Sequence, residues 1–435
     1  MFFDKKLFGW VCVSWLLFNG GPGYPAEVPE LGHAAEARDV VGGEGVMPTY
    51  WMNRSRRMDQ VLLTSQQVRQ VNQEILRKGN AMAFLAGYPE IVPAEDIRSK
   101  MLAAMKAYSG WELPRLFKNG KQLSWEDWQA VKKNCGFEIP KKEQTVRYGV
   151  TVKRTNIRLL PVVEGWYDSP RVSGIDKMQG GVLDPAEPVA VLDTSVDGKF
   201  FFVQSRNCTG WVDAAGIGTA SREMWMNYVA PADYLVVTAI HRNVTLNNVL
   251  MDFQMGAHIP VTARGDGFVM VRLPLAENGA LSEQEMRMSL DSTVNLGPLP
   301  YSRTNIIRQA FRYLGEPYAR DGSAEGVTSA SFVANVYRTV GIELPQGAAE
   351  QEVSMPETVS MLGKSEGERY ALFFDAQAGT LLFQPGHVML YLGRDGEGEP
   401  MVIHAHETGV TVSDLYDETE EANRIDLLTG MGIVR

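Results

Sequence analysis

Three polar residues in the last third of the chain could together form a hydrolytic centre. Ser329 lies at the start of a helical pattern, whereas His387 and His404 each lie in an apolar run that predicts a strand. A serine hydroxyl attacks a carbonyl carbon when a neighbouring base removes its proton and a further group orients that base. In this arrangement Ser329 would be the nucleophile, His387 the general base and His404 its orienting residue.

The same residues also have a purely structural interpretation. Thr328 and Ser329 stand directly before apolar residues that recur at helical spacing. Both residue types are preferred at helix N-caps, because the hydroxyl accepts a hydrogen bond from an otherwise unpaired backbone N–H group. In this alternative one of them only caps the helix, and His387 is a packed residue of its strand.

A metal site is a further possibility that the spacing of two histidines raises. His404 and His406 are two residues apart on a predicted strand and therefore face the same side, which permits metal binding. The other histidines, His33, His241 and His258, supply no convincing third ligand. We therefore predict no metal and no other cofactor.

The elements that must position these residues follow three successive patterns. Residues 58–146 are largely helical, and Thr64 with Gln67 and Ser124 with Asp127 form predicted capping boxes. Short β-like runs separated by turns then predict small barrels, and a weak internal repeat predicts two of them. The last segment has helices first and an antiparallel sheet afterwards, which is an α+β pattern.

The N-terminus has the layout of a secretory signal. Lys5 and Lys6 precede an uncharged, mostly apolar run over 7–18, and a Gly/Pro-rich segment ends that run. The run is too short to span a bilayer, which needs about 20 residues. The alternative is a buried N-terminal helix. Export would place the remaining cysteines, Cys135 and Cys208, in an oxidising compartment, but they fall in different predicted domains and we do not expect them to pair.

Composition and charge exclude several classes of protein. Of the 435 residues, 45% are hydrophobic and 22% are charged, an ordinary globular mixture that excludes a wholly disordered chain, a collagen-like repeat and a polytopic membrane protein. The net charge of −10 argues against a nucleic-acid partner, because phosphate contacts require a basic surface. Three cysteines are too few for a disulfide scaffold.

Several motifs, in their order and spacing along the chain, resemble those of NlpC-type cell-wall peptidases that carry bacterial SH3-like domains. The motifs of the first SH3-like domain include Arg147-Tyr148-Gly149-Val150, Asp197-Gly198 and Gly210-Trp211-Val212. Those of the papain-like catalytic domain are Leu314-Gly315-Glu316-Pro317-Tyr318, Gly341-Ile342 with Leu344-Pro345, Pro385-Gly386-His387-Val388, and Ile403-His404-Ala405. The resemblance implies hydrolysis of the bond between γ-D-glutamate and a diamino acid in peptidoglycan peptides.

The resemblance fails at the centre of the predicted site. The family has Asp-Cys-Ser-Gly at the start of its active-site helix, where this chain has Thr328-Ser329-Ala330-Ser331. No cysteine follows Cys208, so no shifted alignment restores the thiol. The resemblance also implies that Tyr318, Thr328, Ala330 and Asp176 occupy substrate-binding positions. Thr328 offers no carboxylate to the substrate's amine, and Ala330 offers no hydroxyl to its peptide.

These observations predict an α+β multidomain protein with a helical N-terminal region, two SH3-like β-barrels and a C-terminal papain-like α+β domain. The predicted boundaries are a signal peptide over 1–26, a linker or wrapping arm over 27–57, a helical stabilising region over 58–146, SH3-like domains over 147–220 and 221–298, and a papain-like domain over 299–435.

The resemblance and its failure together favour a catalytically degenerate relative. We expect an exported protein of the periplasm or cell envelope that binds peptidoglycan stem peptides, muropeptides or an envelope partner, without a membrane span after signal cleavage. The alternatives are an active hydrolase that uses Ser329 with His387 and His404, and a structural envelope protein. A basic cluster, Arg147, Lys153, Arg154 and Arg158, could meet substrate carboxylates or form a solvated face.

Overall fold

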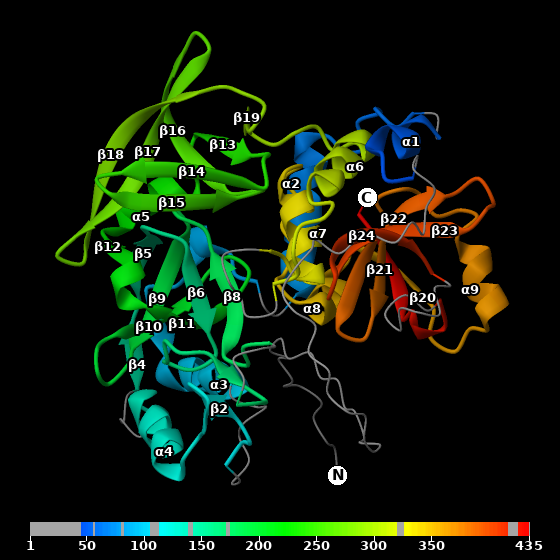
Figure 1. Cartoon of the computed structure of the whole chain (residues 1–435). Helices are drawn as coiled ribbons and strands as arrows, with labels where there is room; N and C mark the ends of the chain where they lie inside the picture. The colour runs from blue at the N-terminus through cyan, green and yellow to red at the C-terminus, as the bar shows by residue number, and fades with distance from the viewer. Residues whose placement is uncertain are drawn as a thin grey trace, which may run out of the picture.

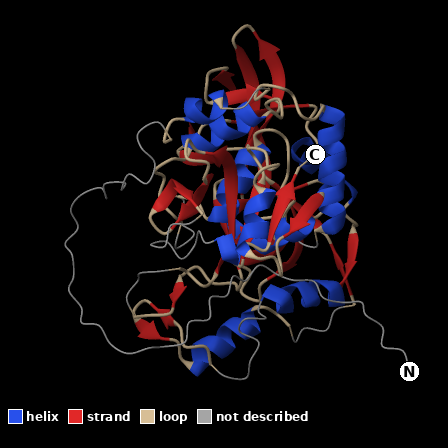
Figure 2. Ribbon diagram, turned by 90° about the vertical axis from the view of Figure 1, so that its right-hand side faces the viewer, coloured by secondary structure: helices blue, strands red, loops and turns tan. Residues whose placement is uncertain are grey.

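The computed structural model describes most of the chain after its first 44 residues. The described ranges are 45–54, 57–79, 82–104, 113–137, 142–170, 175–319, 326–415 and 425–434. The predicted signal peptide, most of the predicted linker and the pair Arg320-Asp321 lie outside them. Helices and strands are mixed through the molecule (Figure 2). In Figure 1 the strands of the middle region occupy one side, the C-terminal sheet occupies the other, and several helices lie between them.

The C-terminal domain is an antiparallel sheet covered by helices, as its sequence pattern predicts. Its helices are α6 (Arg303–Arg312), α7 (Ser329–Arg338), α8 (Ala348–Ser354) and α9 (Glu366–Leu372). Its strands are β20 (Glu357–Ser360), β21 (Leu381–Gln384), β22 (His387–Arg394), β23 (Pro400–His406), β24 (Gly409–Asp414) and β25 (Gly430–Ile433), in the order β20-β25-β21-β22-β23-β24. Helix α7 packs against β22 and β23, the strands that carry the two predicted catalytic histidines.

The two predicted barrels are joined into one series of hydrogen-bonded strands. The first set is β5 (Arg147–Thr151), β6 (Thr155–Arg158), β8 (Gln179–Leu183), β9 (Pro188–Thr194), β10 (Phe200–Gln204), β11 (Thr209–Asp213) and β12 (Ile217–Ala220). The second set follows helix α5 (Arg222–Val229) and comprises β13 (Asp233–Val237), β14 (His241–Leu246), β15 (Val249–Gln254), β16 (His258–Gly265), β17 (Phe268–Glu277), β18 (Ala280–Ser289) and β19 (Val294–Leu296).

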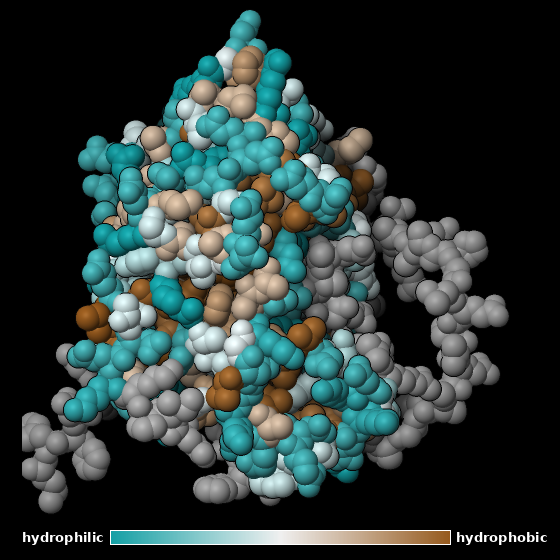
Figure 3. Space-filling model, turned by 90° about the vertical axis from the view of Figure 1, so that its left-hand side faces the viewer, coloured by the Kyte–Doolittle hydropathy of each residue, from teal (hydrophilic) through white to brown (hydrophobic). Residues whose placement is uncertain are grey.

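The prediction of two barrels needs a correction, because neither set closes on itself among the described residues. The order is β19-β13-β16-β17-β18-β12-β5-β9-β10-β11-β6-β8, and β14 pairs separately with β15. Closure of the first set would require β12, which pairs with β5 on one edge, to pair with β8 on its other edge. Strand β12 pairs instead with β18 at Thr219 and Ala280, and Thr219 N donates a hydrogen bond of 2.9 Å to Gly279 O. The outer face of this half is largely hydrophilic, with hydrophobic residues in small groups (Figure 3).

The predicted helical region 58–146 contributes to three hydrophobic cores. Helix α2 (Ser65–Lys78) packs with the C-terminal domain in a core that includes Val71 and Ile75. Helix α1 (Pro48–Asn53) adds Trp51 to the same core and lies in the range predicted as a linker or wrapping arm. The rest packs with the first strand set through a second core. Its elements are β1 (Ile91–Pro93), α3 (Ala94–Ala104), β2 (Phe117–Lys118), β3 (Lys121–Gln122), α4 (Trp125–Asn134) and β4 (Glu143–Thr145), together with β7 (Trp166–Tyr167). The short helix η1 (Leu85–Gly87) instead places Leu85 in the core of the second strand set.

Local sequence signals account for the helix starts in this region. The capping boxes predicted at Thr64 with Gln67 and at Ser124 with Asp127 are both present, and they begin α2 and α4. Two further short helices are η3 (Ala214–Gly216) and η5 (Ile425–Leu427).

None of the helices in the described ranges is long and apolar enough to cross a membrane. Cys135 and Cys208 are both buried, and neither forms a disulfide.

Candidate active site

The two predicted catalytic histidines lie side by side on neighbouring strands. His387 begins β22 directly after a tight turn, in which Gly386 has a φ of +77° that favours glycine. His404 lies on β23 and is fully buried. The Nε2 atom of His387 is 2.9 Å from the Nδ1 atom of His404, which is a hydrogen-bond distance. The structure therefore brings together the predicted base and the residue predicted to orient it.

Burial makes both histidines neutral at physiological pH. Desolvation, with a smaller contribution from His406, lowers the pKa of His387 to about 3. Desolvation also lowers the pKa of His404 well below its usual value, and the neighbouring histidines add to this effect. An imidazole with so low a pKa is a poor general base at pH 7, since the most effective catalytic pKa lies near the working pH.

His406 is the third member of this group of rings. Its ring centroid lies 6.4 Å from that of His387 and 5.9 Å from that of His404. Its Nδ1 atom is buried and has no hydrogen-bond partner. Within the described ranges no group of three or more His, Cys, Asp or Glu side chains is arranged to hold a metal ion.

The start of helix α7 is built as a helix cap. The Thr328 hydroxyl accepts a hydrogen bond of 3.1 Å from Ser331 N, and Ser331 Oγ accepts one of 2.9 Å from Thr328 N. The predicted cap is therefore Thr328, while Ser329 is the first helical residue and is 3% exposed. The carbonyl of the next residue, Ala330, accepts a 2.9 Å hydrogen bond from Gln351 Nε2 on α8. This contact binds α8 to the first turn of α7.

Tyr318 lies beside the residues that lead into α7. It forms a parallel β-bridge with Val327, and Val327 N donates a hydrogen bond of 3.1 Å to Pro317 O. Gly326 has a φ of +96°, and a Cβ atom there would lie 2.4 Å from Pro317 O, so this close approach requires glycine. The structure thus places Tyr318 beside Val327, the residue that precedes Thr328, and the substrate-binding roles of Tyr318, Thr328 and Ala330 stay predictions.

Asp176 is engaged within the first strand set. One oxygen, Oδ2, accepts a hydrogen bond of 2.5 Å from Arg158 Nη1, and the other accepts hydrogen bonds from the backbone N–H groups of Trp166 and Met178 at 2.9 and 3.0 Å. The side chain is 4% exposed. These contacts give Asp176 a structural role, and its predicted substrate-binding role stays a prediction.

The predicted basic cluster does not form a single solvated face. Arg158 is buried with Asp176, and Arg154 Nη1 lies 3.5 Å from Asp252 Oδ2 of the second strand set. Arg147 donates a hydrogen bond of 2.6 Å to the Thr194 hydroxyl.

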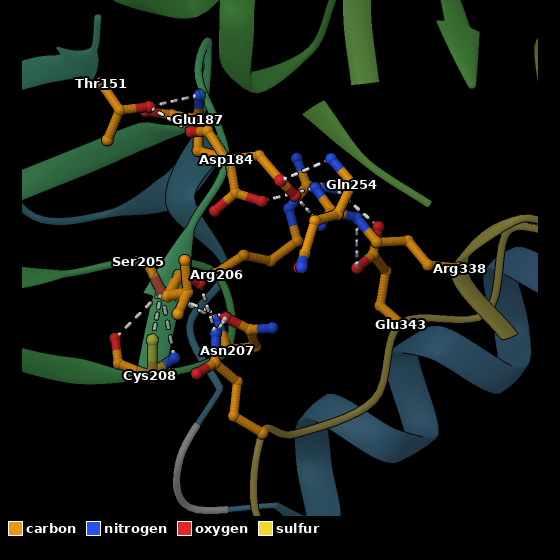
Figure 4. Close-up of polar contacts among 12 residues, drawn as sticks. Thr151, Asp184, Glu187, Ser205, Arg206, Asn207, Cys208, Gln254, Arg338 and Glu343 are labelled. Carbon is orange, nitrogen blue, oxygen red and sulfur yellow. Dashed lines mark hydrogen bonds and ion pairs between the residues drawn. The ribbon is translucent and has the colours of Figure 1, made fainter. Parts of the chain in front are cut away.

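Sequence reasoning missed a group of buried charges that joins three parts of the molecule. Arg338, the last residue of α7, donates hydrogen bonds to Asp184 Oδ2 at 3.2 Å and to Glu187 Oε1 at 2.5 Å. Glu343, after α7, accepts one of 3.0 Å from Arg206 Nη1. Gln254 N, at the end of β15, donates to Asp184 Oδ1 at 3.0 Å. Figure 4 shows these side chains converging; we call them the charged hub.

No local signal in the sequence could have identified the charged hub. Its partners are separated by 70 to 154 residues along the chain. The charges also differ in their response to burial. Burial raises the pKa of Glu187 despite the attraction of Arg338. Burial alone would also raise the pKa of Glu343, but the guanidinium groups of Arg206 and Arg338 lower it to about 2.

Comparison with known proteins assigns two of these regions to families. Residues 315–426 match the NlpC/P60 family, and residues 168–213 match the SH3 domain of SH3b1 type. The first range contains Tyr318, Ser329, His387 and His404. The chain therefore carries an NlpC/P60 domain together with an SH3b domain. No curated protein matches the chain.

Two solved structures illustrate the relationship. An NlpC/P60 endopeptidase from Photobacterium damselae subsp. piscicida has a TM-score of 0.68 and 15% identity, over 89% of this chain and 94% of its own. An NlpC/P60 family protein from Bacillus cereus has a TM-score of 0.44 and 17% identity, over 59% of this chain and 82% of its own. The first match extends the similarity in fold to nearly the whole described chain.

Proposed function

We propose that this protein is an exported cell-envelope relative of peptidoglycan endopeptidases that binds stem peptides in its NlpC/P60 domain without cleaving them. The observation that carries the proposal is the start of α7, where Thr328 and Ser331 form a capping box around Ser329. The position at which the family places its thiol therefore holds a hydroxyl in a neutral, capped helix end. An extracytoplasmic location follows from the family's cell-wall substrates.

The chemistry of the neutral site supports binding over cleavage. A papain-like centre relies on a thiolate that the helix N-terminus and a protonated histidine stabilise. Here the residue is Ser329, and the pKa of His387, near 3, keeps its imidazole uncharged. A serine hydroxyl that relies on so weak a base would have neither the ionised nucleophile nor a strong proton acceptor.

One observation favours a second candidate function, a hydrolase that uses Ser329. The hydrogen bond between His387 and His404 is intact at 2.9 Å, with His404 fully buried and His387 half-buried. A base that is already oriented needs only a suitable nucleophile and substrate to act. Slow hydrolysis of the same peptides would support this candidate.

A single experiment distinguishes these functions. The mature protein is incubated with L-Ala-γ-D-Glu-diaminopimelate, products are analysed by mass spectrometry, and binding is measured by calorimetry. We expect no product and a dissociation constant between about 10 µM and 1 mM, because Thr328 supplies no charge for the peptide's amine. Cleavage would support the hydrolase. Neither binding nor cleavage, with folded protein, would overturn both and favour a structural envelope protein.

A matched pair of variants tests the location of binding. Tyr318→Ala should weaken binding about tenfold, which corresponds to about 1.4 kcal/mol, because Tyr318 lies beside the start of α7. Tyr370→Ala removes a tyrosine from α9 of the same domain and should leave affinity unchanged. Equal affinities in the two variants would place the peptide elsewhere.

A further inference from the structure

A third polar residue extends the pair of histidines into a chain. Ser413 lies on β24, which pairs with β23, and its position is diagonal to His404 across the two strands. Its Oγ atom is 3.0 Å from His404 Nε2, and Ser413 is 3% exposed. Both ring nitrogens of His404 are therefore engaged, with His387 on one side and Ser413 on the other.

A neutral imidazole carries one proton, so the chain has two possible arrangements. In the first, His387 Nε2–H donates to His404 Nδ1, and His404 Nε2–H donates to Ser413 Oγ. In the second, all donors and acceptors are reversed, since a serine hydroxyl can either donate or accept. The first arrangement leaves a lone pair on His387 Nδ1, whereas the second places a proton there.

We infer that Ser413 is a positioning residue that holds the first arrangement. Both histidines then carry their proton on Nε2, and the Ser413 hydroxyl accepts from the buried His404 Nε2–H group, an acceptor that this group loses in Ser413→Ala. The contact with Ser413 also prevents the buried His404 ring from turning over, because a turned ring would lose both hydrogen bonds. The result is an acceptor at His387 Nδ1, fixed in direction by a residue two hydrogen bonds away.

The inference deepens the proposed function, and it rests on that function only for the use that the site makes of the His387 Nδ1 lone pair. A lone pair at His387 Nδ1 serves a binding site as an acceptor for peptide N–H groups, and serves a hydrolase as the base. The proton arrangement itself can be measured without any ligand. Its failure is therefore distinguishable from a failure to bind stem peptides.

The direct test is nitrogen NMR of the mature protein labelled with ¹⁵N-histidine at pH 7. We expect the Nε2–H tautomer for both His387 and His404. Ser413→Ala should convert His404 to a mixture of tautomers or to the Nδ1–H form, and Ser413→Thr, which keeps the hydroxyl, should restore the original signals. A Nδ1–H tautomer of His404 in the unaltered protein would overturn the inference, and this measurement does not depend on any variant folding.

A second readout uses a thiol placed at the start of α7. In Ser329→Cys, the rate of alkylation by iodoacetamide is followed against pH, and the parent chain supplies the background from Cys135 and Cys208. Adding Ser413→Ala should lower the apparent pKa of the new thiol by at least about half a unit, because the reversed arrangement places a proton on His387 Nδ1 that can donate to the thiolate. Adding Thr411→Ala, on the same face of β24, should change nothing. An unchanged pH profile with Ser413→Ala would contradict the inference.

The outcomes separate the two proposals. Nε2–H tautomers that depend on Ser413, together with no peptide binding, would keep Ser413 as a positioning residue and remove the proposed function. Peptide binding together with tautomers that do not respond to Ser413→Ala would keep the proposed function and remove Ser413 as a positioning residue.

Discussion

At the scale of single residues, the candidate site combines a hydrogen-bonded histidine pair with a helix start that the family resemblance identifies as the nucleophile position. By that resemblance, Thr328, Ser329 and Ala330 stand where the family has Asp, Cys and Ser, and this correspondence stays a prediction. Thr328 has a structural role, because it caps α7. A cap interaction stabilises a helix by about 1 kcal/mol, so this residue has a reason to be retained without chemistry.

The capping role makes a repair of the site feasible. Aspartate is also a good N-cap, so Thr328→Asp should preserve α7. The triple variant Thr328→Asp, Ser329→Cys and Ala330→Ser should cleave L-Ala-γ-D-Glu-diaminopimelate at least about tenfold faster than Ser329→Cys alone, because only the triple variant restores the groups that position the substrate. Product formation is measured by mass spectrometry.

The control for this repair is iodoacetamide. It should abolish any activity of the repaired variant and have no effect on the parent chain, in which burial raises the pKa of both Cys135 and Cys208 to about 12. Equal rates in the single and triple variants would show that substrate positioning does not limit the reaction.

At the scale of elements, strands β22 and β23 hold two histidines whose desolvation favours the neutral form, and this has a consequence for stability. In the folded state the pKa of His387 is about 3 and that of His404 is well below its usual value, whereas both titrate near 6.5 when unfolded. The unfolded chain therefore binds protons first as the pH falls. Stability is full above about pH 6.5 and is lost as the pH falls towards 3.

We therefore expect the free energy of unfolding to decrease between pH 7.5 and 5.5. The decrease is at most about 1.4 kcal/mol per pH unit for each such histidine. His258 acts in the same direction, since burial and the charge of Arg338 lower its pKa to about 3. Denaturant titrations at several pH values measure the effect.

His404→Asn supplies the comparison, because an amide can still donate and accept hydrogen bonds but does not titrate. It should have a shallower pH dependence than the unaltered protein. If this variant does not fold, His387→Asn serves the same purpose. The same slope with and without the substituted histidine would show that its ring is not neutral in the folded protein.

At the scale of the whole molecule, the charged hub ties the C-terminal domain to both strand sets. Arg338 lies on α7, Asp184 and Glu187 belong to the first strand set, and Gln254 belongs to the second. The helix that presents Ser329 at one end is therefore anchored to the SH3b region at the other. This arrangement fixes the orientation of the strand sets relative to the candidate site.

Removing the central cation should uncouple these parts. Arg338→Met leaves Asp184 and Glu187 without their guanidinium partner, and breaking such a buried pair typically costs about 3 to 5 kcal/mol. Adding Glu187→Gln should recover part of the loss, because one unpaired charge is then removed. Free energies of unfolding from denaturant titration measure both effects, and limited proteolysis reports on separation of the domains.

The matched control is Arg308→Met, which removes an exposed arginine from α6 of the same domain. It should change the free energy of unfolding by no more than about 0.5 kcal/mol. If Arg338→Met lowers the free energy of unfolding no more than this control does, the charged hub does not hold the domains together.

The sequence by itself determined the local elements and the order of the candidate residues. The capping boxes at Thr64, Ser124 and Thr328, and the strands that carry His387 and His404, depend on residues within a few positions of one another. Short-range patterns of this kind are expressed in the sequence directly, because helix caps and strand alternation are local effects. The similarity to NlpC-type peptidases was carried by such short motifs.

Only the tertiary structure decided which distant residues meet. Ser413 reaches His404 through the register of two strands, Arg338 reaches Asp184 across 154 residues, and β12 pairs with β18 where two separate barrels were predicted. The single helical region over 58–146 likewise divides among three cores. These contacts arise because burying apolar surface is favourable and a buried charge requires a partner, wherever that partner lies along the chain. The periodicity of one segment does not indicate which distant residue the partner is.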